Sequence, residues 1–239
     1  MFLTPDRIYD ANGVTVKEYL LTKHNPNRIQ MPGIRDKSLL GVTIHNTDAI
    51  KVSGTTMSEQ YTRATVNGNM GTVRVHFYVD EVEAWQDLPL DHQGWHAADG
   101  NGDGNTATIA IECIGNSPKA EDNAARLAAW LLDKFGLDTS AVFTHTYWLN
   151  VRDSKGAGLD KDARCTLPHP YKTCPAYIIP HWKAFVAKVK GYQRSVPADE
   201  PAKARYYVQA GAFSSKENAE KYLESVKKFY PDAFIKEMS

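Results

Sequence analysis

Cysteine is scarce in this chain, whose 239 residues include only Cys113, Cys165 and Cys174. An odd and sparse set of cysteines does not make the disulfide framework that stabilises many small secreted domains. Each cysteine is therefore expected to be reduced, either as a metal ligand or as a small buried hydrophobic residue. A disulfide between Cys165 and Cys174 stays open as an alternative.

The chain also lacks net charge and long hydrophobic runs. Its 28 Lys and Arg residues balance 28 Asp and Glu residues, which argues against nucleic acid as the main partner, because phosphate-binding surfaces need clustered cations. No apolar run approaches the roughly 20 residues that span a bilayer, so no membrane helix is expected. The first ten residues, MFLTPDRIYD, lack the pattern of a secretory signal. We therefore expect synthesis as a soluble cytosolic protein.

What the chain does have is the composition of a globular protein, with 42% apolar and 23% charged residues. One stretch departs from it: RSVPADEPAKA, residues 194–204, places two prolines among alanines and alternating charges. Such a stretch is typical of a linker. The sequence therefore predicts a main domain of residues 1–193 and a small unit of residues 205–239.

Apolar, β-branched runs alternate with amphipathic segments along the main domain. Strands are expected at 39–46, 73–80, 106–115 and 141–145, and helices at 57–67, 121–137 and 175–190, the last with Pro175 at its start. Strands that alternate with helices predict an α/β fold with a mixed central sheet flanked by helices.

Two of the expected strands deliver a histidine at their ends. His45 follows LLGVTI and His145 follows AVFT, and ligands gather where the strands of an α/β sheet end. Cys174 lies in KTCP, just before an expected helix. Two imidazoles and one thiolate would make a three-ligand zinc site with a fourth position for water. The alternative for His45, in a chain with eight histidines, is a hydrogen-bonded residue at the edge of the core.

An ordered set of short motifs points to a family. The chain has HNT at 45–47, WHA at 95–97, IAIE at 109–112, TH at 144–145 and KTCP at 172–175. Together they resemble the zinc-dependent N-acetylmuramoyl-L-alanine amidases of the type-2 group, which include phage endolysins and bacterial autolysins and are similar to the peptidoglycan recognition proteins. The resemblance covers about residues 35–190. It implies an amidase-2 fold, peptidoglycan as the substrate and Zn²⁺ as the cofactor.

The resemblance assigns roles to six residues: zinc ligands His45, His145 and Cys174, catalytic Glu112 and Lys172, and substrate-binding His96. Trp95, next to His96, is a further substrate-binding candidate that could stack on a sugar or peptide face, with core packing as the alternative. Zinc would lower the pKa of a bound water toward about 7. Glu112 would carry protons, and Lys172 would stabilise the oxyanion together with the metal. The implied reaction is cleavage of the amide between N-acetylmuramic acid and L-alanine, with lysis of the wall. The alternative from the sequence alone is that Glu112 is a solvent-facing residue of a strand and that Lys172 is a solvated lysine on the surface.

The spacing of the ligands departs from the family pattern. In many members the second histidine lies close before the last ligand, whereas 29 positions separate His145 from Cys174. The stretch between them, residues 149–171, is polar and rich in Gly and Pro, which is typical of an inserted surface loop. His169 in this stretch is a rival for the second histidine ligand, and Cys165 is a rival for the sulfur. A rigid strand end holds a ligand better than a loop does, which favours His145.

Other interpretations stay open. One is a non-catalytic peptidoglycan-recognition protein, against which the presence of Cys174 argues, and another is a structural zinc site, for which no fourth ligand is evident. The loop at 99–106, DGNGDGNT, resembles the start of an EF-hand, but Ala110 stands where the bidentate Glu is required. This loop therefore predicts a tight connection. His76 and Trp148 are expected to be core residues.

The small unit has a βαβ pattern. It begins with YYVQAGAF at 206–213, continues with a helical pattern capped by Ser214 or Ser215, and reaches DAFIK at 232–236. The pattern resembles half of a SPOR domain, a module that binds peptidoglycan glycan strands. About 35 residues bury little core, so we expect this unit to pair with a second copy in a homodimer, and docking on the main domain is the alternative. The protein would reach the wall during phage or prophage lysis, or lysis of a mother cell.

Overall fold

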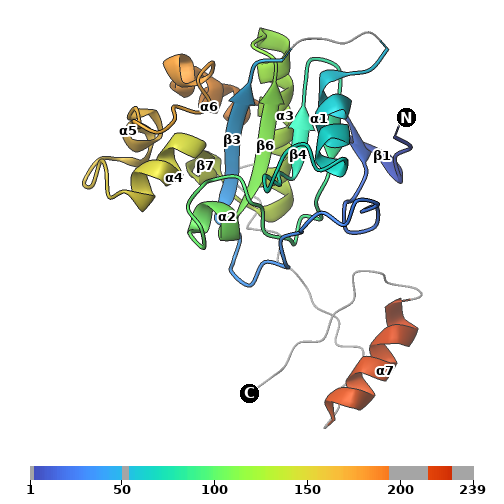
Figure 1. Ribbon diagram of the computed structural model, residues 1–239. Coiled ribbons are helices and arrows are strands. Elements are labelled where there is room, and N and C mark those ends of the chain that lie inside the picture. The colour runs from blue at the N-terminus through green and yellow to red at the C-terminus, as the bar shows by residue number, and fades with distance from the viewer. Residues whose placement is uncertain (1–2, 50–53, 194–214, 228–239) are drawn as a thin grey trace. The chain divides into compact units, whose positions relative to one another are not determined.

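The computed structural model describes residues 3–49, 54–193 and 215–227 (Figure 1). The chain separates into two units, Met1–Arg194 and Ser195–Ser239, and each is considered by itself. All the expected site residues lie in the first unit.

The first unit is built on a seven-stranded sheet with the order β1-β2-β5-β4-β6-β3-β7. The strands are β1 (Arg7–Ala11), β2 (Val14–Glu18), β3 (Gly41–Thr47), β4 (Phe77–Val79), β5 (Ala84–Gln86), β6 (Thr108–Ile114) and β7 (Val142–Thr144). The pairs β1–β2 and β5–β4 are antiparallel, and the other four pairs are parallel. The mixed sheet predicted from the sequence is therefore confirmed.

Three strands, β1, β2 and β5, correspond to no predicted strand. β1 and β2 form a hairpin through Asn12 and Gly13, whose φ angles of 55° and 84° suit a tight two-residue turn. The Asn-Gly pair is the sequence signal for this hairpin, because it follows one short run and precedes VTVKE, which alternates buried and more exposed residues. β5 has three residues, which are too few to establish a periodicity.

Helices cover both faces of the sheet. α3 (Pro118–Phe135) and α6 (Trp182–Tyr192) pack on one face, where Ile44 and Ile111 belong to the main core. α1 (Met57–Val66) packs on the opposite face beside Ala110 and Ile114, and Figure 1 shows α1 and α3 on the two sides of the sheet. Within the described ranges, no helix combines the length and the apolar composition needed to cross a bilayer.

Helix α3 begins three residues before the predicted range of 121–137. The Ser117 hydroxyl accepts a hydrogen bond from the Ala120 N–H at 3.1 Å, and Pro118 occupies the first turn, where its missing N–H costs nothing. At the other end, Gly136 adopts a left-handed conformation with φ of 66°. The predicted stop at this glycine is confirmed.

The helix predicted over 175–190 begins too early. α6 starts at Trp182, after a short 3₁₀ turn, η2 (Ile179–His181). A helix from Pro175 would place Pro180 in its interior, where proline has no N–H to donate and its ring clashes with the preceding turn. From Trp182 onward the apolar spacing holds, because Trp182, Phe185 and Val189 are all buried.

The stretch 149–171 is only in part the surface loop that its composition predicts, since its exposed turns occupy residues 153–159. It contains the end of α4 (His145–Arg152) and all of α5 (Lys161–Thr166), which Asp160 caps by accepting from the Ala163 N–H. Cys165 belongs to the main core, and His169 is 6% exposed. The polar residues and glycines of this stretch conceal a short capped helix with one buried face.

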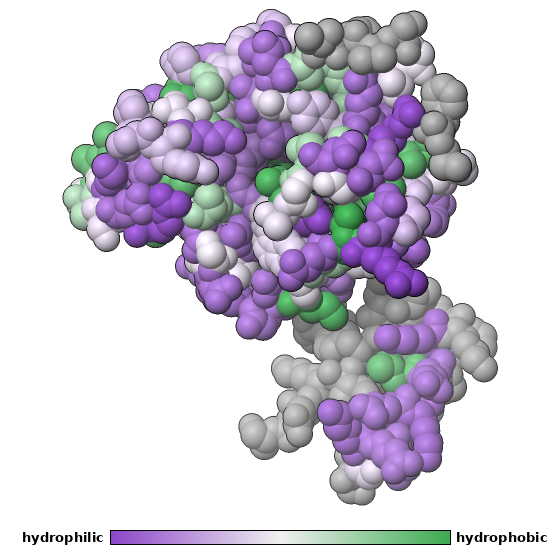
Figure 2. Space-filling view, in the orientation of Figure 1, coloured by the Kyte–Doolittle hydropathy of each residue, from purple (hydrophilic) through white to green (hydrophobic). Residues whose placement is uncertain are grey.

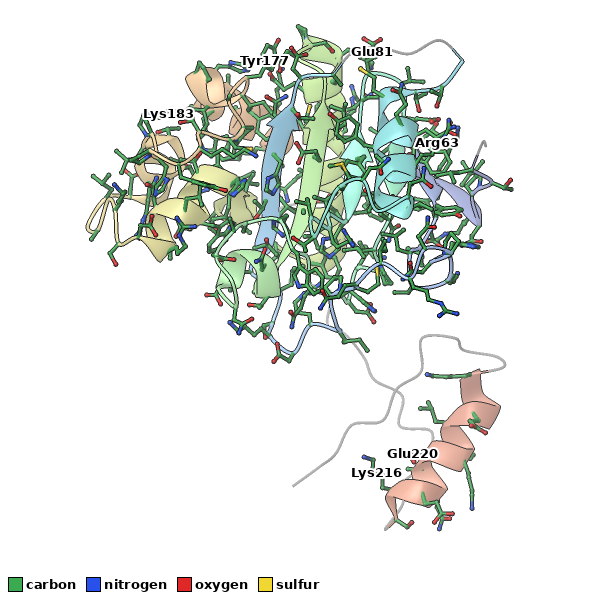
Figure 3. The ribbon with its side chains drawn as sticks, viewed as in Figure 1. Arg63, Glu81, Tyr177, Lys183, Lys216 and Glu220 are labelled. Carbon is green, nitrogen blue, oxygen red and sulfur yellow. The ribbon has the colours of Figure 1, made fainter. Side chains whose placement is uncertain are left out.

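The second unit is described through α7 (Lys216–Lys227), where Lys216 Nζ lies 4.0 Å from Glu220 Oε1 one turn further along the helix (Figure 3). The Ser215 hydroxyl accepts from the Asn218 N–H at 3.5 Å, so the predicted helix with a serine at its N-terminus is confirmed. The visible surface of α7 is mainly hydrophilic in Figure 2. The predicted linker at 194–204 and the predicted strands at 206–213 and 232–236 lie outside the described residues.

A glycine sets the spacing of β3 and β7. A Cβ atom on Gly41 would lie 1.9 Å from the carbonyl oxygen of Ala141. We expect Gly41→Ala to lower the free energy of unfolding by at least about 3 kcal/mol, because backbone rather than a flexible side chain would have to move. Urea unfolding measures the change, and Gly33→Ala, where a Cβ has no atom within 4 Å, is the control. Equal effects of the two substitutions would contradict the prediction.

Candidate metal centre

Two neighbouring parallel strands place the two histidines side by side. His45 lies near the end of β3, and His145 is the first residue of α4, directly after β7. β3 and β7 are paired, with Ile44 opposite Thr144. The Thr144 hydroxyl caps α4 by accepting from the Tyr147 N–H at 2.9 Å. The turn from strand to helix therefore directs His145 toward His45, and their ring centroids are 4.8 Å apart.

Cys174 joins the two histidines from the loop before α6. One ligand atom from each of the three residues lies within 4.8 Å of the others, and His45 Nδ1 is 3.9 Å from Cys174 Sγ. In a tetrahedral zinc site, bonds of 2.0–2.3 Å put ligand atoms about 3.3–3.7 Å apart. All three side chains are buried, with 1–5% exposure. The structure therefore brings the three predicted ligands to one point.

The hydrogen bonding of the histidines fits a metal ion. Both ring nitrogens of His145 are buried, and among the described residues neither has a hydrogen-bond partner in good geometry, which is costly unless another group satisfies one of them. His45 Nε2 lies 2.9 Å from His96 Nδ1. This contact leaves His45 Nδ1, the atom that faces Cys174, available as a ligand, and a partner on the second nitrogen is typical of metal-binding histidines.

The surroundings keep all three candidate ligands uncharged in the metal-free chain. Burial, with a smaller contribution from Lys172, lowers the pKa of His145 to about 3. Burial and the neighbouring His145 hold the pKa of His45 well below its ordinary value. Burial and the nearby Glu112 raise the pKa of the Cys174 thiol to about 12. The imidazoles are thus in the neutral form that binds metal, whereas the thiol must lose its proton when a cation arrives.

Glu112 lies on the strand next to His45. β6 pairs with β3 in parallel, and Glu112 is directly opposite His45, so both side chains emerge on the same face of the sheet. Burial raises the pKa of Glu112 to about 7, and the charge of Lys172 opposes this shift. A carboxyl group that titrates near neutrality can both accept and return a proton at physiological pH.

Lys172 is exposed at the rim of this group. Its positive charge lowers the pKa of His45, His145, Glu112 and Cys174. The charge of Lys172 thus acts on four side chains, which come from three strand ends and a loop. Lys172 is therefore close enough to act electrostatically on a substrate bound there.

His96 supports the centre from the side. Its main-chain N–H and that of Ala97 both donate to Asn105 Oδ1 at 2.8 Å, and Asp99 accepts from the Gly104 N–H at 2.8 Å. The loop at 99–106 thus makes the tight connection that its sequence predicts, ending in the short helix α2 (Asp103–Ala107). Trp95 is half-buried on the same segment, and its substrate-binding role stays a prediction.

His169 and Cys165, the alternative candidates for metal ligands, do not belong to the His-His-Cys group. His169 Nε2 contacts Asp153 Oδ2 at 3.0 Å, and burial raises the pKa of the Cys165 thiol to about 11. Among the described residues, neither joins the metal-competent group. His76 and Trp148 are core residues, as expected: both nitrogens of His76 have backbone partners, and the Trp148 indole donates to Thr43 Oγ1 at 2.8 Å.

Thr146 is a positioning residue that the sequence does not indicate. Its hydroxyl donates to the Cys174 carbonyl at 3.0 Å and accepts from the Cys174 N–H at 2.7 Å, and its own N–H donates to the same carbonyl at 2.9 Å. The residue next to His145 therefore holds the backbone of Cys174 on both sides. No signal in the sequence could reveal contacts across 28 positions.

We expect Thr146→Val to weaken zinc binding by roughly 10- to 100-fold, the usual effect of removing a group that orients a ligand. Valine has nearly the same shape as threonine but leaves the buried Cys174 N–H without its partner, which costs about 1–3 kcal/mol of stability. Competition with a chromogenic chelator measures the affinity. Thr146→Ser keeps the hydroxyl and should bind zinc as the parent does, so a loss of affinity in both variants would contradict the assigned role.

The fold and the site together define an α/β protein with a buried His-His-Cys centre that can hold a metal ion. A family model described as N-acetylmuramoyl-L-alanine amidase matches residues 35–176, more than half of the chain. The chain therefore belongs to the N-acetylmuramoyl-L-alanine amidase family, and the resemblance noted in the sequence is confirmed.

Two similar proteins are also named N-acetylmuramoyl-L-alanine amidases. The chain is 32% identical over 156 residues to the N-acetylmuramoyl-L-alanine amidase XlyA of Bacillus subtilis (strain 168), covering 64% of this chain and 44% of XlyA. It is 29% identical over 179 residues to the N-acetylmuramoyl-L-alanine amidase CwlH of the same organism, covering 72% of this chain and 60% of CwlH. The chain thus spans about half the length of these curated relatives.

Solved structures share the fold. The catalytic domain of XlyA matches with a TM-score of 0.53 and 28% identity, over 74% of this chain and 99% of that domain. A mutant endolysin from Bacillus subtilis matches with a TM-score of 0.56 and 28% identity, with the same coverage. The expected amidase-2 fold of the first unit is confirmed.

A second family model, described as SPOR domain, matches residues 182–237. The match begins at the first residue of α6, whose Trp182, Phe185 and Val189 are buried in the first unit. The SPOR match therefore extends upstream of the predicted unit at 205–239 and includes the predicted linker.

Proposed function

We propose that this chain is a peptidoglycan hydrolase that cleaves the amide between N-acetylmuramic acid and L-alanine and acts on the cell wall. The observation that carries the proposal is the convergence of His45, His145 and Cys174 at one edge of the sheet, although His45 and Cys174 are 129 positions apart. Membership of the amidase family supports the reaction class. Within this proposal residues 1–193 are the catalytic domain.

We propose Zn²⁺ as the cofactor, held by His45 Nδ1, one ring nitrogen of His145 and Cys174 Sγ. Three protein ligands of these types are the pattern of catalytic rather than structural zinc sites. When bound, the ion would lower the pKa of a coordinated water and polarise the scissile carbonyl. The buried thiol and imidazoles exclude bulk water from the ligand side of the site, which strengthens the electrostatic interactions there.

Glu112 is the proposed general base and acid. It takes the proton of the attacking water on its carboxylate and returns that proton to the amine of L-alanine as the amide bond breaks. Burial holds its pKa at about 7, so both protonation states are accessible at neutral pH, as this double role requires. Its place opposite His45 on the neighbouring strand supports the assignment.

Lys172 is the proposed oxyanion stabiliser. Attack on the amide carbonyl moves negative charge onto its oxygen, and a fixed ammonium group beside that oxygen lowers the barrier. Lys172 is exposed while its charge reaches the buried site, so a substrate that enters from solvent meets it first. His96 and Trp95 are proposed to line the substrate cleft from the facing loop.

The proposal is tested by digesting purified peptidoglycan with the zinc-loaded protein and analysing the products by mass spectrometry. We expect new free amino groups on L-alanine and intact glycan strands. New reducing sugar ends without free L-alanine would contradict the amidase assignment. Digestion that survives Cys174→Ser unchanged would contradict the proposed ligand set.

We further propose that residues 205–239, after a linker at 194–204, bind peptidoglycan and pair with a second copy of the chain. The SPOR-domain match supports wall binding, and the homodimer rests on the small size of the unit. Size-exclusion chromatography with light scattering on the full chain and on residues 1–193 tests the pairing. Equal monomeric masses for the two proteins would refute it.

A further inference from the structure

Three side chains, Arg152, Asp153 and His169, form a compact hydrogen-bonded cluster at the end of α4, the helix that begins with His145. Asp153 receives two hydrogen bonds from Arg152, Nε to Oδ1 at 2.7 Å and Nη2 to Oδ2 at 2.9 Å. His169 Nε2 contacts Asp153 Oδ2 at 3.0 Å. The His169 side chain is 3% exposed and that of Asp153 is 35% exposed. A buried imidazole thus depends on a half-exposed carboxylate that an arginine holds in place.

The cluster ties three segments of the chain together. Arg152, at the end of α4, donates through Nη1 to the Ala98 carbonyl at 2.8 Å, and Ala98 follows His96 by two residues. On the other side, the Tyr171 N–H donates to His169 Nδ1 at 3.2 Å. The Arg152 guanidinium also lies 5.9 Å from the centre of the Tyr171 ring.

These contacts fix the state of His169. Its Nδ1 accepts from the Tyr171 N–H, so this nitrogen carries no proton, and its Nε2 donates to Asp153. Loss of the Asp153 carboxylate would leave a buried N–H without a partner. The ring would then no longer be fixed in the orientation that accepts from Tyr171.

The segment held in this way carries the lysine of the site. Tyr171 immediately precedes Lys172, and Cys174 follows two residues later. Tyr171 is 71% exposed, so core packing does not hold this part of the chain. The described contacts that anchor it on the side away from Cys174 are those to His169 and Arg152.

We propose that Arg152, Asp153 and His169 form a strut that positions Tyr171 and Lys172 at the metal centre and ties them to the loop that carries His96. The inference rests on the proposed function, because the strut acts through Lys172 and touches no ligand. In this proposal the function of the stretch 149–171 is to anchor Lys172. Such an anchor is needed because 29 positions separate His145 from Cys174, the last two proposed ligands. All three members of the strut are positioning residues.

Hydrogen exchange and kinetics of the full chain test the strut. We compare Asp153→Ala, which removes the carboxylate, with His169→Gln, which keeps a donor to Asp153 but not the acceptor for Tyr171. Lys155→Ala is the control, since Lys155 is exposed in the same stretch and outside the cluster. We expect faster amide exchange at residues 169–174 in both strut variants. On a soluble muropeptide we expect kcat to fall roughly 10- to 100-fold with KM little changed, because displacing Lys172 affects mainly the transition state.

The outcomes separate the strut from the proposed function. Faster exchange with lower kcat and unchanged zinc content supports the strut. Faster exchange with unchanged kcat would overturn it, because the cluster would then be merely structural, and unchanged exchange would overturn it directly. If the parent protein hydrolyses no muropeptide, the proposed function fails, and zinc-loaded protein still tests through exchange whether the cluster holds residues 169–174.

Discussion

Replacement of Cys174 by alanine should abolish stoichiometric zinc binding and, with it, hydrolysis of peptidoglycan. The side chain supplies the only anionic ligand in the proposed set, so its loss leaves two neutral imidazoles to hold a divalent ion. We expect affinity to fall by more than the ~100-fold that the loss of a ligand's hydrogen-bond partner can cost. Metal analysis after dialysis measures the zinc content, and turbidity of a cell-wall suspension measures lysis.

A second buried cysteine provides the matched control. Cys165 is as buried as Cys174, but its sulfur lies outside the metal-competent group. Cys165→Ala should lower stability modestly through the small cavity it leaves and should retain one zinc per chain. Zinc retained in Cys174→Ala, or lost equally in both variants, would show that Cys174 is not a ligand.

The positions of the two histidines could be predicted because local pattern determines them. LLGVTI and AVFT are short β-branched runs, and the strands that they form, β3 and β7, end within two residues of His45 and His145. That β3 and β7 are neighbours could not be predicted, because the pairing of strands about a hundred positions apart is decided by the packing of the whole sheet. Cys174 lies on a loop without periodicity, so only the resemblance to a family could indicate it.

The features that the sequence did not predict correctly also have specific physical causes. Pro180 delays the start of the helix predicted at 175–190 to Trp182 for a local steric reason that the apolar spacing does not reveal. The buried face of α5 consists of one residue, Cys165, and a single apolar position cannot show the 3.6-residue period by which a helix is recognised in a sequence. The positioning role of Thr146 could not be predicted, because its hydrogen-bond partner Cys174 lies 28 positions away in the sequence. Local pattern thus indicates the ends of long strands, whereas contacts between loops depend on the folded chain.

Glu112→Gln should lower kcat by roughly 10²- to 10⁴-fold, the usual contribution of general acid–base catalysis, while zinc content stays at one per chain. Glutamine keeps the shape of the side chain but can neither take nor return the proton of water. Glu121→Gln is the control, since Glu121 is a buried carboxylate on α3 that is paired with His181 and Lys188 and lies outside the metal-competent group. An equal loss of kcat in both variants would contradict the assigned role of Glu112.

The titration of Glu112 gives the same substitution a second effect that does not depend on catalysis. Its pKa rises from an ordinary 4.5 to about 7 on folding, so below pH 4.5 the carboxyl is neutral in both states. Between pH 4.5 and about 7 the unfolded chain has lost this proton while the folded chain keeps it, so stability falls as the pH rises and levels off above 7. The shift corresponds to at most about 3 kcal/mol.

Urea unfolding of the metal-free parent and Glu112→Gln at pH 5 and pH 8 measures this effect. Buried neutral histidines such as His145 act in the opposite direction, because stability increases with pH up to about 6.5, where the unfolded histidine loses its proton, and they do so equally in both proteins. The difference between the two proteins therefore isolates Glu112, and Glu112→Gln should gain stability relative to the parent at pH 8. In the zinc-loaded enzyme a cation close to the carboxylate favours its charged form, so the acid limb of kcat/KM should have its midpoint at or below pH 7. An acid limb that persists unchanged in Glu112→Gln would assign the titration to another group.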